Sequence, residues 1–208
     1  MPEFLALEWD AYEISGASAQ IVRKSVQVKQ CFVSRWPAEI DPYSNARQAG
    51  EWLKQELARQ GIEERDVLVA LPREMVAIKP MELPAVPDEE LPDLVRLQAA
   101  TRSALPLEQL KIDFIPAPRA DGEQTRRVSL ATLPKRQFDR VQHLLESAGL
   151  QPAALSLCPA ATASVIFQAG RKRADVAAGA WLVVSRRGRR SGIARVPLAR
   201  ALSSRWRL

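Results

Sequence analysis

The chain has 208 residues, 47% hydrophobic and 26% charged, which is ordinary globular composition and enough for one large domain or two small ones. No apolar run approaches the roughly 20 residues that span a bilayer, and Glu3, Glu8 and Asp10 stand where a secretory signal would be basic, so we expect a cytoplasmic protein. Cys31 and Cys158 lack metal-ligand spacing and are expected to be buried, reduced thiols.

The positive charge is concentrated at the C-terminal end. The net charge is +6, yet residues 1–170 alone carry −4, because residues 171–208 hold eleven basic residues against one acid, Asp175. The basic residues of this segment are Arg171, Lys172, Arg173, Arg186, Arg187, Arg189, Arg190, Arg195, Arg200, Arg205 and Arg207. We therefore expect a mildly acidic body followed by a basic tail, flexible from about Arg171.

The first part of the chain predicts the element order β-β-β-α-β. Apolar alternation predicts an antiparallel meander of three strands at Phe4–Glu8, Tyr12–Ile21 and Val26–Val33. A helix follows, with Ser44 or Asn45 as its N-cap and Gly61 just past its end. Its apolar face comprises Ala46, Ala49, Leu53 and Leu57. The continuous apolar run 66–72 predicts a strand covered on both faces.

Recurrent prolines mark residues 72–134 as an inserted α+β subdomain. We expect a strand around Val76 and Ile78, and then a helix beginning near Asp88, whose apolar positions are Leu91, Leu94 and Val95. Two further strands, at 110–116 and 127–134, are expected to pair across the loop that contains Asp121 and Gly122.

The remainder predicts helix, strand, helix and strand. The clearest helix runs from Lys135 to Ala148, with Gly149 as its terminator. Its apolar stripe comprises Phe138, Val141, Leu144 and Leu145. A short strand at 154–157, a helix at 159–167 and a last strand at 180–185 follow, and we expect that last strand to have no partner.

This order of elements resembles the first lobe of the actin-like ATPase superfamily, and more narrowly the type IV pilus assembly protein PilM and the cell-division protein FtsA. The resemblance rests on "LALEWD", on the block "VLVALPREMVAIKPMELPAVPDEELPDLVRLQAATRSALPLEQLKIDFIP", and on "LLESAGLQPAALSLCPAATASVIF", and it covers about 4–168. It implies an α/β, ribonuclease H-like lobe with a mixed sheet and an α+β insert. The implied division is 1–71 with 135–170 as the core, 72–134 as the insert, and 171–208 as the tail.

The phosphate-binding motifs of this family are degenerate here. The family has an Asp-x-Gly turn in its first hairpin, where this chain has Glu8 and Asp10, and an acid in place of glycine repels phosphate. At the second phosphate turn Ser185 replaces the acid, and Gly188 is the nearby glycine. We expect no catalytic, cofactor-binding or metal site, and hence a pseudo-ATPase that does not use ATP and Mg²⁺.

What the resemblance implies is a scaffold at the cytoplasmic face of the inner membrane. Such a protein holds a short cytoplasmic tail of an inner-membrane assembly protein in a groove to which residues 72–134 contribute. Two alternatives stay open: an ATP-binding protein whose second lobe comes from another chain, and a binder of anionic lipid or nucleic acid through the tail. Oligomeric state stays open, as does whether a fragment, a truncated gene or a changed reading frame explains the ending at Leu208.

Two further polar features have structural interpretations. His143, the single histidine, lies beside the helix stripe and is expected to be a partly buried structural residue. Asp88, Glu89 and Glu90 resemble a paired-carboxylate site, but their place at a helix start indicates that they complement the helix dipole.

Overall fold

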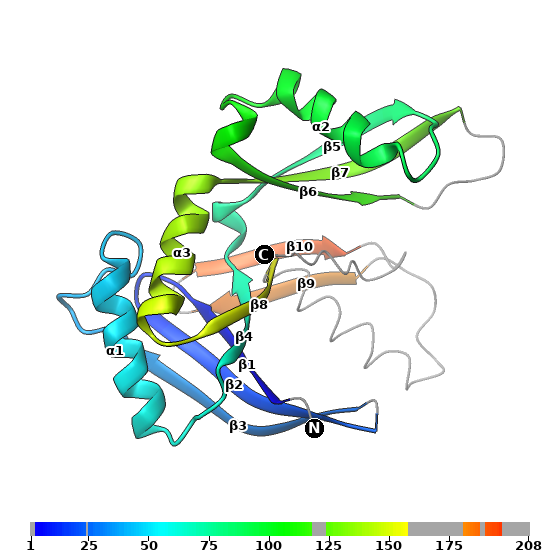
Figure 1. Ribbon diagram of the computed structural model, residues 1–208. Helices are drawn as coiled ribbons and strands as arrows, with labels where there is room; N and C mark the ends of the chain where they lie inside the picture. The colour runs from blue at the N-terminus through cyan, green and yellow to red at the C-terminus, as the bar shows by residue number, and fades with distance from the viewer. Residues whose placement is uncertain (1–2, 24, 118–123, 158–180, 188–189, 197–208) are drawn as a thin grey trace.

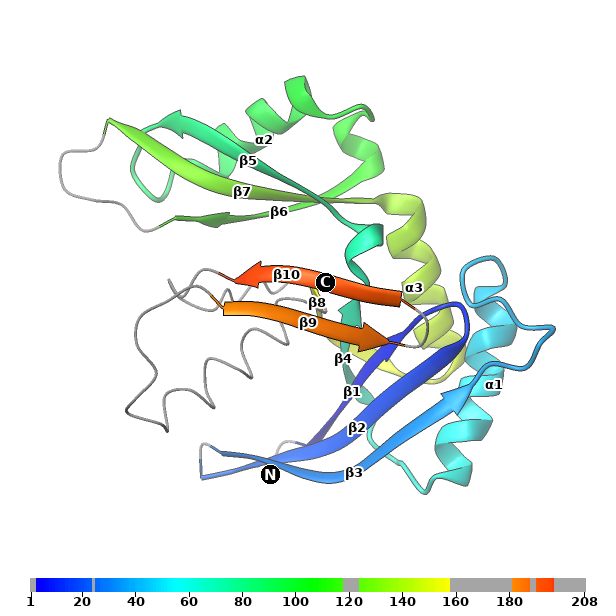
Figure 2. The ribbon, with the colours of Figure 1, turned by 180° about the vertical axis from the view of Figure 1, so that it is seen from behind.

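The computed structural model describes residues 3–23, 25–117, 124–157, 181–187 and 190–196. They form a five-stranded mixed sheet with two helices on one face, a three-stranded sheet that carries a third helix, and a separate two-stranded hairpin (Figure 1). The third helix covers the face of the smaller sheet that points away from the larger one, in front and rear views alike (Figure 2).

The five-stranded sheet confirms the predicted meander and the β-β-β-α-β order. Its strands are, in spatial order, β3 (Ser25–Arg35), β2 (Glu13–Val22), β1 (Glu3–Trp9), β4 (Asp66–Leu71) and β8 (Gln151–Leu157). β1, β2 and β3 pair antiparallel, whereas β4 pairs parallel with β1 and with β8. The short strand expected at 154–157 thus begins three residues earlier, at Gln151.

The two helices on this sheet begin and end where local signals predicted. In α1 (Ala46–Arg59) the Asn45 side chain accepts the N–H of Gln48 at 3.3 Å, and Gly61 follows the helix at φ 69°. α3 (Lys135–Ser147) is likewise followed by a glycine, Gly149, at φ 75°. A positive φ is strained for most residues, which explains a glycine at each end.

One apolar core lies between the sheet and these helices. The stripes predicted for both helices are buried in it together with the inner face of the sheet, including Leu5, Leu7 and Ile14. α1 and α3 approach so closely that a Cβ atom on Gly50 would lie 2.3 Å from the carbonyl oxygen of Leu144.

The insert has its own sheet and its own core. Its strands, in the spatial order β5-β7-β6, are β5 (Ala77–Pro84), β7 (Thr125–Pro134) and β6 (Leu110–Pro116). Its helices are α2 (Leu91–Arg102) and two 3₁₀ turns, η1 (Arg73–Met75) and η2 (Leu107–Gln109). The predicted antiparallel pairing of β6 with β7 is confirmed. The second core is formed by Met81, Leu83, Leu91, Val95, Ala99, Val128 and Leu130.

Several expectations differ from the structure. β4 is buried on one face only, because its residues alternate: Val67, Val69 and Leu71 point into the core and Leu68 is exposed. Cys31 is exposed because the buried side of β3 falls on its neighbour, Phe32. His143 is exposed rather than partly buried, because it lies on the outer side of α3, just before the buried residues Leu144 and Leu145. α2 begins at Leu91, three residues after Asp88.

The last strand has a partner, contrary to expectation. β9 (Trp181–Arg187) pairs antiparallel with β10 (Arg190–Val196), so that Arg187 lies opposite Arg190. The arginine and glycine content of β10 hides its alternation in the sequence. Cys158, the helix expected at 159–167 and the rest of the tail lie outside the described residues, and the flexibility of the tail stays a prediction, as do the domain boundaries.

Among the described residues, none of the helices is long and apolar enough to cross a membrane.

Glu64, in the loop between α1 and β4, ties that loop to the meander. Its side chain is 6% exposed, and its Oε1 accepts the Lys29 ammonium at 2.8 Å and the Ser18 hydroxyl at 2.5 Å. Burial alone would raise the pKa of the Glu64 carboxyl, but the hydrogen bonds from Lys29 and Ser18 outweigh it and lower this pKa from 4.5 to about 2.

This lowered pKa predicts a loss of stability in acid. Because the folded-state pKa of Glu64 lies below its ordinary value, its contribution is complete above pH 4.5 and is lost as the pH falls towards 2. We expect Glu64→Gln to cost about 1 to 3 kcal/mol at pH 6, and much less at pH 2.5. Urea unfolding at both pH values measures the difference, and an equal cost at both would contradict the assignment.

Candidate functional site

The turn between β1 and β2 is the position at which the family resemblance implies a phosphate-binding loop. There the Asp10 carboxylate folds back over the turn: its Oδ1 accepts the backbone N–H of Tyr12 at 2.8 Å and that of Glu13 at 2.9 Å. Such an Asx arrangement satisfies, within the chain, backbone donors of the type that otherwise bind an anion.

Other backbone groups of the turn are also bound within the protein. Asp10 donates its N–H to the Glu13 carbonyl at 3.0 Å, and Trp36 donates its backbone N–H to the Tyr12 carbonyl at 3.0 Å. The Trp36 indole N–H donates to the Asp10 carbonyl at 2.9 Å. The Tyr43 hydroxyl donates to the backbone carbonyl of the buried Trp9 at 3.4 Å. The segment before α1 thus fastens the turn to the body.

These residues do not fit a nucleotide phosphate. The Asp10 carboxylate occupies two of the amides that would bind phosphate, and its charge opposes a second anion there. Within the part of the chain that the structure describes, no three His, Cys, Asp or Glu side chains are grouped so as to hold a metal ion. At the second turn Ser185 lies in β9 opposite Gly192, and residues 188–189 are outside the described residues.

Removing the Asp10 carboxylate should loosen this turn. Asp10→Ala leaves the amides of Tyr12 and Glu13 without their acceptor, and we expect it to lower the free energy of unfolding by about 1 to 2 kcal/mol. Asp10→Asn retains an acceptor oxygen and should cost clearly less. Urea denaturation of both variants tests this. Equal losses would show that the charge of Asp10, rather than its acceptor geometry, holds the turn.

The second candidate surface is the face of the insert sheet opposite α2. Strand register gives this face two cross-strand rows: one contains Ile78, Ala131 and Asp113, and the next contains Pro80, Ser129 and Ile115. Neighbouring residues such as Met81 and Leu130 point the other way, into the core under α2. Because α2 lies on the far side, the face points towards the β9–β10 hairpin and, beyond it, the five-stranded sheet (Figure 1). Ala131 is buried, and we call the other five residues the insert face.

The insert face combines apolar and polar groups. Ile78, Ile115 and Ser129 are partly exposed, and Pro80 is exposed. Asp113 is half-buried, and burial raises the pKa of its carboxyl above the ordinary value although its Oδ1 accepts the Phe114 N–H at 2.8 Å. An acid beside partly exposed isoleucines offers both apolar contact and a hydrogen-bond acceptor, as peptide-binding surfaces do.

One end of the insert sheet is anchored to the main core. Val76, Ala131 and Leu133 are buried in the core that contains α1 and α3. The Lys111 ammonium lies 4.4 Å from the centre of the Phe138 ring, which joins β6 to α3 by a cation–π contact. The insert face is therefore held at a defined position beside α3.

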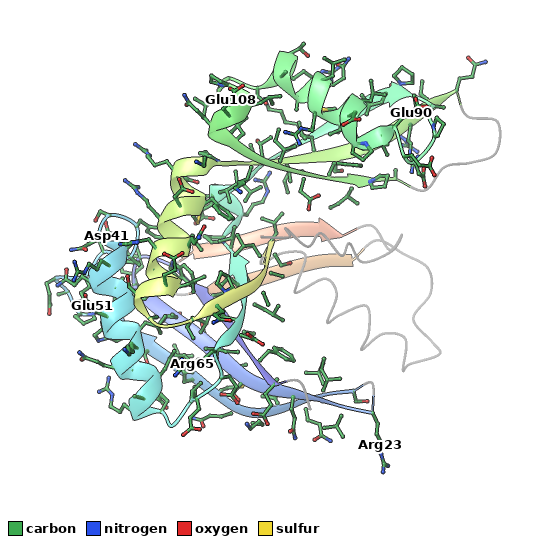
Figure 3. All side chains as sticks on the ribbon, in the orientation of Figure 1. Arg23, Asp41, Glu51, Arg65, Glu90 and Glu108 are labelled. Carbon is green, nitrogen blue, oxygen red and sulfur yellow. The ribbon has the colours of Figure 1, made fainter. Side chains whose placement is uncertain are left out.

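The acidic run before α2 is not a paired-carboxylate site. Asp88 forms an ion pair with Arg126 of β7, and Glu90 is the N-cap residue of α2 but makes no capping hydrogen bond with its side chain. The sequence predicts that all three acids complement the dipole of the helix. Asp88 does not, because its ion pair with Arg126 ties the loop to the sheet. Glu90 lies on the outer part of the insert (Figure 3).

Comparison with known proteins identifies the fold. No family model matches the sequence, and a sequence comparison with curated proteins finds no match. Among solved structures, the chain is similar to one described as the PilM–PilN type IV pilus biogenesis complex, with a TM-score of 0.74, 22% identity, and coverage of 88% of this chain and 55% of that one. The chain thus spans about half the length of that relative.

Two further structures are more distant. The cytoplasmic domain of EpsL, an inner-membrane component of the type II secretion system of Vibrio cholerae, matches with a TM-score of 0.50 and 12% identity over 77% of this chain and 59% of that one. A protein of Bacteroides thetaiotaomicron with an actin-like ATPase fold and unknown function matches with a TM-score of 0.47 and 10% identity, over 95% of this chain and 66% of that one. The likeness to the PilM structure confirms the predicted fold class: an actin-like first lobe with a mixed sheet and an α+β insert.

Proposed function

We propose that this chain is a non-catalytic interaction module of a type IV pilus or type II secretion assembly system. In this proposal it lies at the cytoplasmic face of the inner membrane and binds a short cytoplasmic segment of an inner-membrane assembly protein. The observation that carries the proposal is the likeness to PilM in its complex with PilN, over 88% of the chain. The similarity to the cytoplasmic domain of EpsL supports the same class of assembly.

The insert face is our candidate for the peptide contact. An extended peptide alternates its side chains, so it can lay apolar residues against Ile78 and Ile115 while a donor reaches Asp113. The absence of enzymatic activity is part of the proposal, and it is supported by the Asp10 carboxylate on the first-turn amides.

Synthetic peptides test the partner class. Peptides that cover the cytoplasmic tails of inner-membrane pilus and secretion proteins from the same genome are titrated into the full chain by fluorescence anisotropy. We expect one to bind, and Ile115→Arg to weaken its binding at least tenfold, because a charge would be buried in the contact. Leu105→Arg, an exposed apolar position outside the insert face, is the matched control. Binding that Ile115→Arg leaves unchanged would move the site elsewhere.

Calorimetry with Mg²⁺-ATP tests the proposal that the chain does not bind ATP. We expect no saturable heat from the wild-type chain. Micromolar binding that is lost on changing Glu8 or Asp10 would overturn this reading of the turn and restore an ATP-binding protein completed by another chain.

A further inference from the structure

The β2–β3 hairpin carries an exposed apolar face. Register places Val33 opposite Ser15, Cys31 opposite Ala17, Val28 opposite Ala19 and Val26 opposite Ile21. Val26, Val28 and Val33 are 62%, 60% and 66% exposed, and Ile21 and Cys31 are exposed as well. We call Ile21, Val26, Val28, Cys31 and Val33 the hairpin face.

This face lies on the side of the sheet opposite α1. The alternate positions of β2, Ile14, Gly16 and Ser18, are buried on the helix side, and a Cβ atom on Gly16 would meet the rings and methyls of Phe32 and Leu7. A register irregularity at Ser18/Ala19 sets Lys29 out of the regular pairing, so Val28 and Val26 stay on the same side as Cys31 and Val33.

The hairpin is basic towards its tip. Residues 14–38 contain four basic residues, Arg23, Lys24, Lys29 and Arg35, and no acid, whereas Glu13, the first residue of β2, lies opposite Arg35 at the other end of the hairpin. Arg23 lies at the hairpin tip with φ 47°, and its side chain points away from the body (Figure 3). The Lys29 ammonium forms ion pairs with Glu3 and Glu64. The Glu64 carboxylate also accepts the hydroxyl of Ser18, which lies on the helix side of β2, so Glu64 lies on the α1 side of the sheet. The part of the hairpin face nearest the tip therefore combines apolar surface with positive charge, whereas Glu8 and Glu13 lie at its other end.

We propose that the hairpin face docks on an anionic lipid surface. Basic residues are attracted to anionic headgroups, and adjacent aliphatic side chains gain by burial at the boundary between headgroups and acyl chains. Arg23 at the tip meets lipid phosphates, and Val26 and Val28 enter the boundary. The occupant is a bilayer rather than a second copy, because Val26 and Val28 lie next to the basic tip, and two copies packed through these valines would bring the Arg23 residues of the two copies together.

A dye at Cys31 reports directly on this contact. The full chain with Cys158→Ser is labelled at Cys31 with a polarity-sensitive NBD maleimide and mixed with phosphatidylglycerol/phosphatidylcholine vesicles. We expect a blue shift and brighter emission with these vesicles and none with pure phosphatidylcholine. In a control chain, both native cysteines are changed to serine and the label is placed on Leu97→Cys of α2. Its emission should not change when vesicles are added. This readout separates the hairpin from any electrostatic binding by the arginine-rich segment, which would not bury Cys31.

Vesicle co-sedimentation gives a second measurement that needs no label. Val26→Gln with Val28→Gln should lower the partition coefficient about tenfold, as should Arg23→Glu. The matched controls, Leu97→Gln and Arg96→Glu, change an exposed leucine and an exposed arginine of α2 and should have no effect.

Several outcomes would overturn the proposal. An unchanged Cys31 label on anionic vesicles, or hairpin variants that partition like the wild type, would remove the lipid contact. A change in the label on raising protein concentration without vesicles would assign the face to a second copy. A blue shift of the label with single-stranded RNA but not with vesicles would assign the hairpin face to nucleic acid.

Discussion

Gly50→Ala is expected to lower the free energy of unfolding by about 3 kcal/mol, and Gly50→Leu to prevent folding. Gly50 lies where α1 crosses α3, and a Cβ atom there would lie 2.3 Å from the Leu144 carbonyl oxygen and 2.6 Å from the Ser147 Cβ. Both neighbours belong to α3, one of them to its backbone, so the helices must separate. Alanine favours helix by about 1 kcal/mol over glycine, so a net loss isolates the steric cost.

Ala58→Leu is the control for Gly50. Ala58 lies on the exposed side of α1, so added bulk there should change stability by less than about 0.5 kcal/mol. Urea unfolding followed by circular dichroism measures each variant. A Gly50→Ala protein as stable as the wild type would mean that α1 and α3 are not in contact at Gly50.

Glu56→Ala is expected to cost about 2 to 3 kcal/mol. The Glu56 side chain is 3% exposed; its Oε1 accepts the Ser34 hydroxyl at 2.6 Å and the Gln60 side-chain amide at 3.0 Å, and its Oε2 pairs with Arg59. Alanine removes the acceptor of the partly buried Ser34 hydroxyl and Gln60 amide as well as that of Arg59, and it leaves a cavity between α1 and β3. Donors that folding has partly desolvated then lose their partner, which is costly.

Glu51→Ala provides the matched change on the same helix. Glu51 pairs with Arg47 at 2.9 Å, but both side chains are exposed, and such a pair contributes less than about 0.5 kcal/mol. The difference in urea midpoint between the two variants is the measurement. Similar costs at Glu51 and Glu56 would show that burial of the Glu56 carboxylate contributes nothing.

Most of the fold could be predicted because its signals are local. Asn45 and Gly61 bracket α1 by capping chemistry, and the stripe of α3 follows from helical periodicity. The partner of β9 could not be predicted, because Arg190 and Arg195 obscure the apolar alternation of β10. The exposure of Leu68 was missed because a continuous apolar run does not report which face a neighbouring layer covers.

The candidate sites were harder to predict. The sequence motif predicts Asp10 to be a charge that repels phosphate, whereas in the structure its carboxylate accepts the backbone N–H groups of the residues two and three positions ahead. That geometry has a sequence signal, since an aspartate in a tight turn commonly accepts its own backbone N–H groups. The insert face has no such signal, because Ile78, Asp113 and Ser129 come from three separate strands and meet only through register.

The parallel pairing of β4 with β8 sets an order in which the chain can fold. Asp66 pairs with Gln151, so the main sheet cannot be completed until the whole insert and α3 have left the ribosome. The antiparallel pairs β1–β2, β2–β3 and β6–β7 join neighbours along the chain and can form as soon as they emerge. During synthesis the outer edge of β4 therefore waits unpaired, which makes it the point where a nascent chain is most open to wrong strand partners or to a chaperone.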